Sequence, residues 1–303
     1  MKGKLILCCC LLCICWLLPP LTANAQEEMT GEVNWVKGYI SGIGYGTSKP
    51  SGNRVIDKLK ALRAAKVVAQ RDLLELIKGI RVISQTTVEN MMLREDLIST
   101  RVEGTIKGAE VVKQHVEWDG NTPLAVVELR VYMTGSAGSG QLSNTLINTL
   151  DLPRRYGATG NLPIPPIPAE PAPKKPAAPA KISYDSSKPV TGVVIALRGQ
   201  YYEKVLLPVV KTVTKSKRTI TVYSVKSVEP QIIRTYGVAR YAGTLDDAKK
   251  ISYLGENIMI VPADFVSNDN EIFIGTDAAR TIKETIRFDN NYLEKAKVAI
   301  AIQ

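Results

Sequence analysis

The chain has 303 residues and a formal net charge of +10. This length suits two domains of ordinary size once a leader segment is removed. The basic residues are scattered and are not interleaved with aromatic residues, so we do not expect nucleic acid as a partner. The charge instead favours a weak attraction to anionic surfaces of a cell envelope.

The first residues have the pattern of a cleavable secretory signal peptide. Lys2 and Lys4 precede an uncharged apolar run over residues 5–18, and the small-x-small site Ala23-Asn24-Ala25 follows two prolines. We therefore expect a signal peptide over 1–25, cleavage after Ala25, and a periplasmic or outer-membrane associated protein. The apolar run is shorter than the roughly 20 residues of a spanning helix, which leaves a retained anchor as the alternative. No later stretch reaches that length, so we expect no transmembrane span in the mature chain.

All the cysteines lie in the segment that we expect to be removed, at positions 8, 9, 10, 13 and 15. Disulfides, thiol catalysis and cysteine-ligated zinc are thereby excluded for the mature protein. A lipoprotein signal places a cysteine at the cleavage point after small residues, whereas Cys13 follows Leu12 and Cys15 follows Ile14. This spacing argues against lipidation, although the cysteine cluster keeps a lipidated form as an alternative.

Composition divides the mature chain into two domains and a linker. The stretch 135–140 contains only Gly, Ser and Ala, and the stretch 163–179 is rich in proline. A proline-rich segment favours an extended polyproline II spacer. We therefore expect a first domain over 26–135, a linker over 136–188 and a second domain over 189–303, with the two domains folding independently.

The first domain is predicted to pack one long helix on a mostly antiparallel sheet. Residues 31–45 are typical of a strand, Asn53 is a good N-cap, and a helix is expected over 54–78 with Gly79 after it. Strand character returns over 81–88, and 91–100 favours a short helix or loop. The segments 105–118 and 124–133 predict a hairpin around Asp119-Gly120. The apolar stripe expected on the helix comprises Val55, Leu59, Leu62, Ala65, Ala69, Leu73 and Leu76.

The second domain is predicted to be mixed α/β, so the fold class is α+β. Strands are expected over 193–197, 219–224, 231–235, 257–261, 271–275 and 297–302. Capped helices are expected to begin near Leu245 and Ala278, because Thr244 and Thr276 precede them.

Domain one resembles a known family over about a third of the chain. The residues that carry the resemblance include the small-residue face Ala64-Ala65 and Ala69, Asp72-Leu73-Leu74, Ile77-Lys78-Gly79-Ile80-Arg81-Val82, Ser84, Gly104, Ile106 and Gly108 to Val112. This pattern is similar to the membrane-associated lipoprotein family of the LPP-twenty type, which also includes the N-terminal region of flagellar assembly protein T. The resemblance implies an envelope location and a structural or assembly role, linked to flagellar or outer-membrane structures. The acylated cysteine of the family lipoproteins has no counterpart at the expected cleavage point.

The single histidine and three alternate glycines of domain one are candidates for a metal site and a dinucleotide-binding loop, but their sequence context favours neither. His115 is the only histidine, and a lone histidine cannot build a metal cluster, so we expect an exposed strand residue. Gly42, Gly44 and Gly46 follow a strand, but a dinucleotide-binding loop spaces its glycines differently and opens directly into a helix. Glycines at alternate positions instead clear one face of a strand for the long helix or a turn.

Carboxylates and tyrosines provide the remaining candidates. The segment around Asp264, Asp269 and Glu271 lacks the spacing of a calcium loop, so we expect a turn before a strand. Other carboxylate pairs are Glu95-Asp96 and Asp246-Asp247. Tyr201-Tyr202, Tyr236 and Tyr241 could stack on sugars or peptides, although tyrosines more often lie half-buried at strand edges. We predict no catalytic residues, no cofactor-binding residues, no metal ligands and no cofactor.

Two functional hypotheses follow. The first is a non-enzymatic envelope protein with an assembly, scaffold or structural role, whose partners are envelope proteins or a second copy of the chain. The second is a binding module that uses domain two to hold an anionic cell-wall or surface polymer, because of the positive charge and the tyrosines. An enzyme ranks third, because the sequence presents no recognisable acid–base or nucleophile arrangement.

Overall fold

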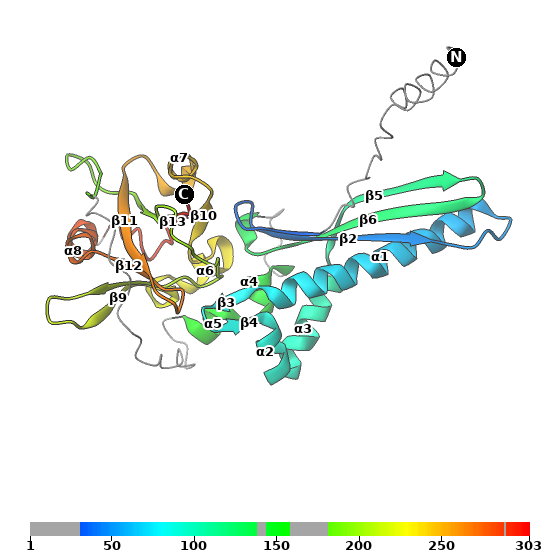
Figure 1. Ribbon diagram of the computed structural model, residues 1–303, viewed down its shortest axis with the longest axis horizontal. Helices are drawn as coiled ribbons and strands as arrows, with labels where there is room; N and C mark the ends of the chain where they lie inside the picture. The colour runs from blue at the N-terminus through cyan, green and yellow to red at the C-terminus, as the bar shows by residue number, and fades with distance from the viewer. Residues whose placement is uncertain (1–30, 138–143, 158–180, 288) are drawn as a thin grey trace, which may run out of the picture. The chain divides into compact units, whose positions relative to one another are not determined.

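The computed structural model describes residues 31–137, 144–157, 181–287 and 289–303. The predicted signal peptide and the proline-rich stretch 163–179 lie outside these residues. The fold is α+β with two domains: a long helix packed on an antiparallel sheet, and a second domain built around a mixed sheet (Figure 1). The predicted fold class is confirmed.

Domain one consists of a four-stranded sheet with helices on one side (Figure 1). The strands lie in the order β1-β2-β6-β5 and every neighbouring pair is antiparallel. Its elements are β1 (Glu32–Asn34), β2 (Tyr39–Thr47), α1 (Arg54–Gly79), β3 (Arg81–Ile83), β4 (Thr86–Thr87), α2 (Val88–Arg94), α3 (Asp96–Lys107), β5 (Glu110–Asp119) and β6 (Thr122–Tyr132).

Helix α1 begins where the sequence predicts, because the Asn53 side chain accepts hydrogen bonds from the backbone N–H groups of Val55 and Ile56. Its register against the sheet differs in part from the predicted stripe. Val55 is 67% exposed and Leu59 is 61% exposed, so these two predictions are wrong. The residues that face the sheet recur every four positions instead and are Asp57, Ala61, Ala65, Ala69, Leu73 and Ile77.

Three glycines set the separation of α1 and β2. A Cβ atom built on Gly44 would lie 2.1 Å from the backbone oxygen of Ala65, and one on Gly46 would lie 2.2 Å from the Ala65 nitrogen. A Cβ on Gly42 would lie 2.6 Å from the Ala69 oxygen. The prediction that these glycines clear a strand face for the helix is confirmed. Alanines of α1 lie opposite Gly44 and Gly46, and Leu73 lies beside Gly42, so the backbones of the helix and the strand approach closely.

The hairpin of domain one is shorter at its start than predicted. Its first strand, β5, begins at Glu110, because the residues before Gly108 belong to α3. The predicted strand over 81–88 is a small β3–β4 hairpin, and Val88 already belongs to α2. On β6 the side chains alternate between the two faces of the sheet, and Val127, Leu129 and Val131 are all buried.

The described start of the predicted linker is folded. Helices α4 (Leu146–Thr149) and α5 (Leu152–Tyr156) follow the 3-10 turn η2 (Gly135–Ala137). Leu146, Leu150 and Leu152 have no exposed surface, so this segment belongs to the core. Arg155 of α5 donates two hydrogen bonds, of 2.5 and 2.6 Å, to the carboxylate of Glu95. The pKa of Glu95 is lowered chiefly by this bond with the guanidinium.

Domain two is built on a seven-stranded mixed sheet in the order β10-β13-β7-β11-β12-β8-β9. The central strand β7 is buried along its whole length, as its unbroken apolar run predicts. The elements are β7 (Gly192–Ala196), β8 (Val210–Val213), β9 (Thr219–Tyr223), η4 (Val225–Ser227), α6 (Pro230–Tyr236), β10 (Arg240–Ala242), α7 (Leu245–Lys249), η5 (Ser252–Leu254), β11 (Ile258–Val266), β12 (Ile272–Ile274), α8 (Thr276–Thr285) and β13 (Val298–Ala301).

One predicted strand of domain two is wrong. Residues 231–235 lie in helix α6, although the adjacent Ile232 and Ile233 favour a strand. Pro230 occupies the first helical turn, where a missing N–H costs nothing. Gly237, at φ +76°, ends the helix. These two flanking signals outweigh the β propensity of the isoleucines.

The two domains contact each other directly. The backbone N–H of Leu206 donates to the oxygen of Arg81 at 3.0 Å, and that of Leu207 donates to the oxygen of Val82 at 2.9 Å. Buried apolar side chains of both domains form one continuous cluster. The expectation that the domains fold without a shared interface is therefore wrong.

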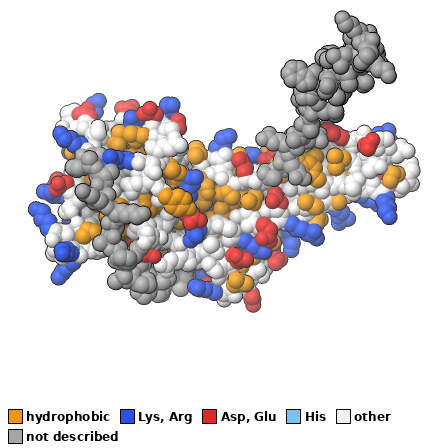
Figure 2. All heavy atoms as spheres, in the orientation of Figure 1, with side chains coloured by type: hydrophobic (Ala, Val, Ile, Leu, Met, Phe, Trp, Pro, Cys, Tyr) orange, Lys and Arg blue, Asp and Glu red, His pale blue; other side chains and the backbone are white. Residues whose placement is uncertain are grey.

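On one face of the molecule, charged side chains of both signs are intermingled (Figure 2). On the face shown in Figure 2, Lys and Arg side chains lie over both domains with acidic side chains among them. Within the described ranges, no helix has both the length and the apolar character needed to cross a bilayer.

The close contact between α1 and β2 should make Gly44 intolerant of any side chain. Gly44→Ala should lower the free energy of unfolding by about 1–3 kcal/mol or more, because the added methyl group overlaps rigid backbone. Gly104→Ala, in α3, is the matched control: a Cβ there meets nothing within 4 Å, so the variant should be neutral or slightly more stable. Urea unfolding of residues 26–303 measures both. Equal stability of the two variants would contradict the close packing.

Candidate functional site

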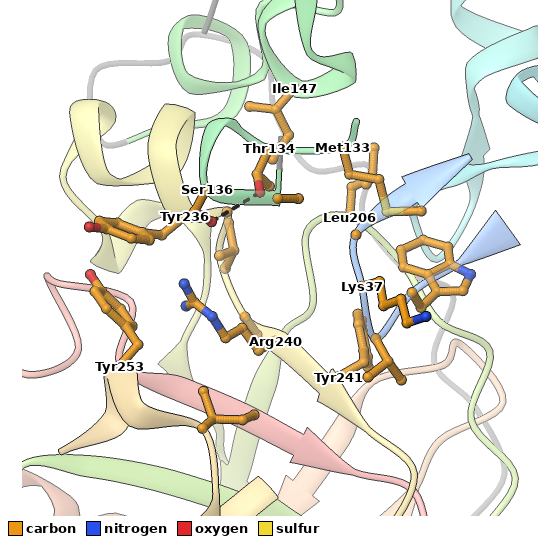
Figure 3. Close-up of a pocket in the computed structure, with 18 of the residues that line it drawn as sticks. Lys37, Met133, Thr134, Ser136, Ile147, Leu206, Tyr236, Arg240, Tyr241 and Tyr253 are labelled. Carbon is orange, nitrogen blue, oxygen red and sulfur yellow. Dashed lines mark hydrogen bonds between the residues drawn. The ribbon is translucent and has the colours of Figure 1, made fainter. Parts of the chain in front are cut away.

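A pocket of about 390 Å³ lies where residues of both domains meet (Figure 3). Domain one provides the turn between β1 and β2 and the residues that follow β6. Domain two provides the end of α6, the start of β10 and the turn η5. The described lining residues are Trp35, Val36, Lys37, Gly38, Met133, Thr134, Ser136, Ala137, Ile147, Val205, Leu206, Tyr236, Gly237, Val238, Ala239, Arg240, Tyr241, Lys250, Ile251, Ser252 and Tyr253.

Arg240 and two tyrosines form the polar centre of the pocket. The rings of Tyr236 and Tyr253 stack with their centroids 4.1 Å apart. The Arg240 guanidinium carbon lies 4.2 Å from the Tyr253 centroid and 5.2 Å from the Tyr236 centroid. In Figure 3 the guanidinium points toward these two rings. This geometry is that of a cation held against the negative faces of aromatic rings.

Local structure fixes each member of this cluster. Tyr236 is the last residue of α6, and Gly237 turns the chain from that helix toward β10. Arg240 is the first residue of β10, an edge strand that pairs in parallel with β13. Tyr253 lies in η5, and its hydroxyl donates a 2.6 Å hydrogen bond to the backbone oxygen of Lys295. The aromatic rings are therefore held in place by the backbone around them.

The positive charge of Arg240 has no acidic partner among the described residues. Its Nη1 atom is buried and has no hydrogen-bond partner in the part of the chain that the structure describes. Burial lowers the pKa of the guanidinium, which shows that the site disfavours an isolated cation. The described lining also contains Lys37 and Lys250 but no Asp or Glu. An anion entering this pocket would meet a desolvated cation that is ready to bind it.

A second pocket, of about 480 Å³, also contains an arginine side chain, but its charge is compensated. It is lined by Arg81, Glu203 and the largely exposed Tyr201, among others. There the cation is already neutralised, because Arg81 Nε lies 2.6 Å from Glu203 Oε1. The Arg240 pocket is the better candidate for an anion site for this reason.

Tyr241 anchors the wall opposite the tyrosine stack. Its hydroxyl donates to the Val205 oxygen at 2.7 Å and accepts from the Val205 nitrogen at 3.1 Å. Burial raises the pKa of Tyr241 to about 12, so this phenol stays neutral. The Trp35 ring from domain one meets the Tyr241 ring edge-on, with centroids 5.5 Å apart. The domains thus share an aromatic contact at the pocket.

The lone histidine and the carboxylates lie elsewhere. His115 is exposed on β5, with Nε2 3.3 Å from Glu117, which confirms the expectation of an exposed strand residue. Glu271 pairs with Lys211 at 2.5 Å, and Asp269 accepts a 3.2 Å hydrogen bond from Gln85. Residues 267–270 form the predicted turn before β12. In the described part of the chain, no three metal-ligating side chains gather into a cluster.

The remaining carboxylates and tyrosines have local roles. Asp246 and Asp247 pair with Lys249 and Lys250 on α7, and Glu95 pairs with Arg155. Tyr236 and Tyr241, predicted as candidates, both line the pocket, whereas Tyr202 is buried against Tyr241 and lines the second pocket. Arg240 and Tyr253 are absent from the sequence-based candidates. No local spacing connects them, because separate turns of domain two bring them together.

Comparison with known proteins concerns domain two. Residues 192–303 match the family described as the second domain of Treponema pallidum Tp0624. The match begins at the first residue of β7 and covers Tyr236, Arg240 and Tyr253, but not the wall that domain one contributes. No curated protein matches the chain.

Because Arg240 has no acidic partner among the described residues, its charge should contribute little to the stability of the fold. Arg240→Met should change the free energy of unfolding by less than about 1 kcal/mol in either direction, because it removes a desolvated charge along with its ring contacts. Arg155→Met is the matched control and should cost about 1.5–3 kcal/mol, because it breaks a two-bond pair with Glu95. Thermal unfolding of residues 26–303 decides this. If Arg240→Met lowered the free energy of unfolding as much as Arg155→Met, Arg240 would have a structural role and the prediction would be wrong.

Proposed function

We propose that the chain is an exported, non-enzymatic protein of a bacterial cell envelope that binds an anionic cell-wall or surface polymer in the Arg240 pocket. The signal-peptide pattern at residues 1–25 supports export, to the periplasm or to the outer membrane. The overall positive charge would concentrate such a polymer near the protein. The pocket would then supply the specific contact.

One observation carries the proposal: the partly buried guanidinium of Arg240 has no acidic partner among the described residues, and it lies in a pocket with two lysines and no described carboxylate. Burying a cation costs free energy that a structural ion pair normally offsets. Proteins retain uncompensated cations of this kind where a ligand supplies the opposite charge. The guanidinium fork suits carboxylate and phosphate equally, since both accept two parallel hydrogen bonds.

The pocket volume limits what part of a polymer can enter. About 390 Å³ is at the small end of the range for ligand sites, enough for one or two sugar residues. Thr134, Ser136 and Ser252 line the same pocket and offer hydroxyl groups to a sugar. We therefore propose an acidic or phosphorylated sugar unit as the bound group.

A second role, in assembly or as a scaffold, is supported by a different feature. Domain one resembles the LPP-twenty-type and flagellar assembly protein T family, whose members are structural envelope proteins. Its sheet also ends in a long, exposed strand, β5. Exposed sheet edges are sites where another strand can add. The two roles are compatible, since they use different surfaces of the chain.

Co-sedimentation with two purified polymers tests the binding role. Isolated peptidoglycan sacculi present carboxylates, and lipopolysaccharide presents phosphates. Residues 26–303 should bind at least one of the two. Arg240→Gln should weaken that binding by about 10- to 100-fold, the value of a charge-assisted hydrogen bond.

Arg218→Gln is the matched control, because it makes the same change in net charge at an exposed turn of domain two. It should leave binding within about twofold of the unchanged protein, since exposed charges contribute weakly. An equal loss for both variants would mean that only net charge matters. Absence of binding to either polymer would also contradict the proposal.

A further inference from the structure

Among the described residues, no strand pairs with the outer side of β5, which forms an edge of the domain-one sheet. It lies last in the order β1-β2-β6-β5, and eight of its ten residues are exposed. A bulge between Val111 and Lys113 interrupts its pairing with β6, so the regular edge runs from Lys113 to Asp119. This stretch contains no proline that would block the addition of another strand.

Helix α1 packs mainly on other strands of the sheet and makes few contacts with β5 itself. Helix α1 packs on β2 and β6 and scarcely reaches β5 (Figure 1). Val116 and Trp118 face the helix side of the sheet, because they pair with Ala125 and Pro123 across β6. Both remain partly exposed there. Trp118 already lies against the first residue of α1, since the Arg54 guanidinium carbon is 4.2 Å from its ring centroid. A strand added beside β5 would cover the part of both side chains that is still exposed.

The charges along the free edge are complementary to those of the same strand running in the opposite direction. Lys113, His115 and Glu117 share the other face of the sheet, and Asp119 continues that face. If two copies of β5 meet antiparallel with Val116 at the centre, Lys113 lies opposite Asp119 of the second copy. His115 then lies opposite Glu117. Each of these two pairs occurs twice, so the edge attracts a copy of itself.

We propose that β5 of one copy pairs antiparallel with β5 of a second copy, with the two Val116 residues opposite each other. The twofold axis would run perpendicular to the sheet, so both α1 helices would lie on the same face. The two four-stranded sheets would become one eight-stranded sheet. Backbone groups on the free side of β5 would gain partners, and the Val116 and Trp118 side chains of both copies would be buried between the helices.

This inference gives the proposed scaffold role its partner and does not depend on the Arg240 pocket. Its failure would leave anion binding untouched, because binding is measured separately with the Arg240 and Arg218 variants. Equally, a protein that binds no polymer could still pair through β5.

Cysteine cross-linking tests the register. The expected mature chain has no cysteine, so Val116→Cys introduces a single thiol. Directly opposed residues have Cβ atoms about 4.5–5.5 Å apart, which is close to the separation that a disulfide needs. Under mild oxidation this variant should form a covalent dimer. Val67→Cys, an exposed valine on α1, should not.

Charge exchange tests the complementarity by sedimentation equilibrium of residues 26–303. Lys113→Glu should weaken dimerisation by about tenfold or more, because two attractive pairs become repulsive. Adding Asp119→Lys to this variant should restore most of the lost affinity, since the pairs become attractive again in reverse. A monomeric protein at about 0.1 mM, equal cross-linking of the two cysteine variants, or no recovery in the double variant would each overturn the proposal.

Discussion

The close contact between α1 and β2 is the constraint on which the rest of domain one depends. Gly44 and Gly46 face alanines of α1, Gly42 faces Ala69 and Leu73, and the backbones approach until no Cβ fits on the three glycines. Larger side chains on either element would lift the helix from the sheet. Dispersion contacts between closely packed backbones and the burial of Leu73 and Ile77 beside them then stabilise the layer.

The pairing of β2 with β6 determines where the domain-one wall of the pocket lies. Strand β2 begins at Tyr39 opposite the last residue of β6, Tyr132, so the turn before β2 and the chain after β6 leave the sheet at the same end. The Met133 nitrogen donates to the Gly38 oxygen at 2.8 Å and ties these two segments together. Domain two brings Arg240 to this end, with its tyrosines already ordered. A rigid wall on one side and an unpaired cation on the other are the features of a preorganised binding site.

The sequence predicts the parts of the fold that are encoded by short-range patterns. The alternating glycines, the Asn53 cap and the β6 alternation all specify their structures within a few residues. Val55 and Leu59 were misplaced, because the pattern rewards large apolar residues whereas the close contact selects alanine. Helix α6 differs from its predicted strand because the β propensity of its isoleucines is outweighed by the flanking Pro230 and Gly237.

The candidate site could be predicted only in part. Tyr236 and Tyr241 are visible in the sequence as aromatic residues. Arg240 and Tyr253, which contact Tyr236 and complete the polar centre of the pocket, come from separate turns of the chain. Whether a charge lacks a partner depends on every neighbour in space, and no sequence pattern reports it. The joining of the domains through Arg81 and Leu206 depends likewise on long-range packing.

The most direct test of the central claim is to observe the Arg240 guanidinium itself while a ligand is added. Its Nε–Hε resonance can be assigned by comparing nitrogen-15 NMR spectra of residues 26–303 and of Arg240→Gln. We expect a saturable shift of this resonance with N-acetylmuramic acid or N-acetylglucosamine 1-phosphate, and none with neutral N-acetylglucosamine. An Arg240 resonance that ignores both acidic sugars, or that responds equally to the neutral one, would contradict the account.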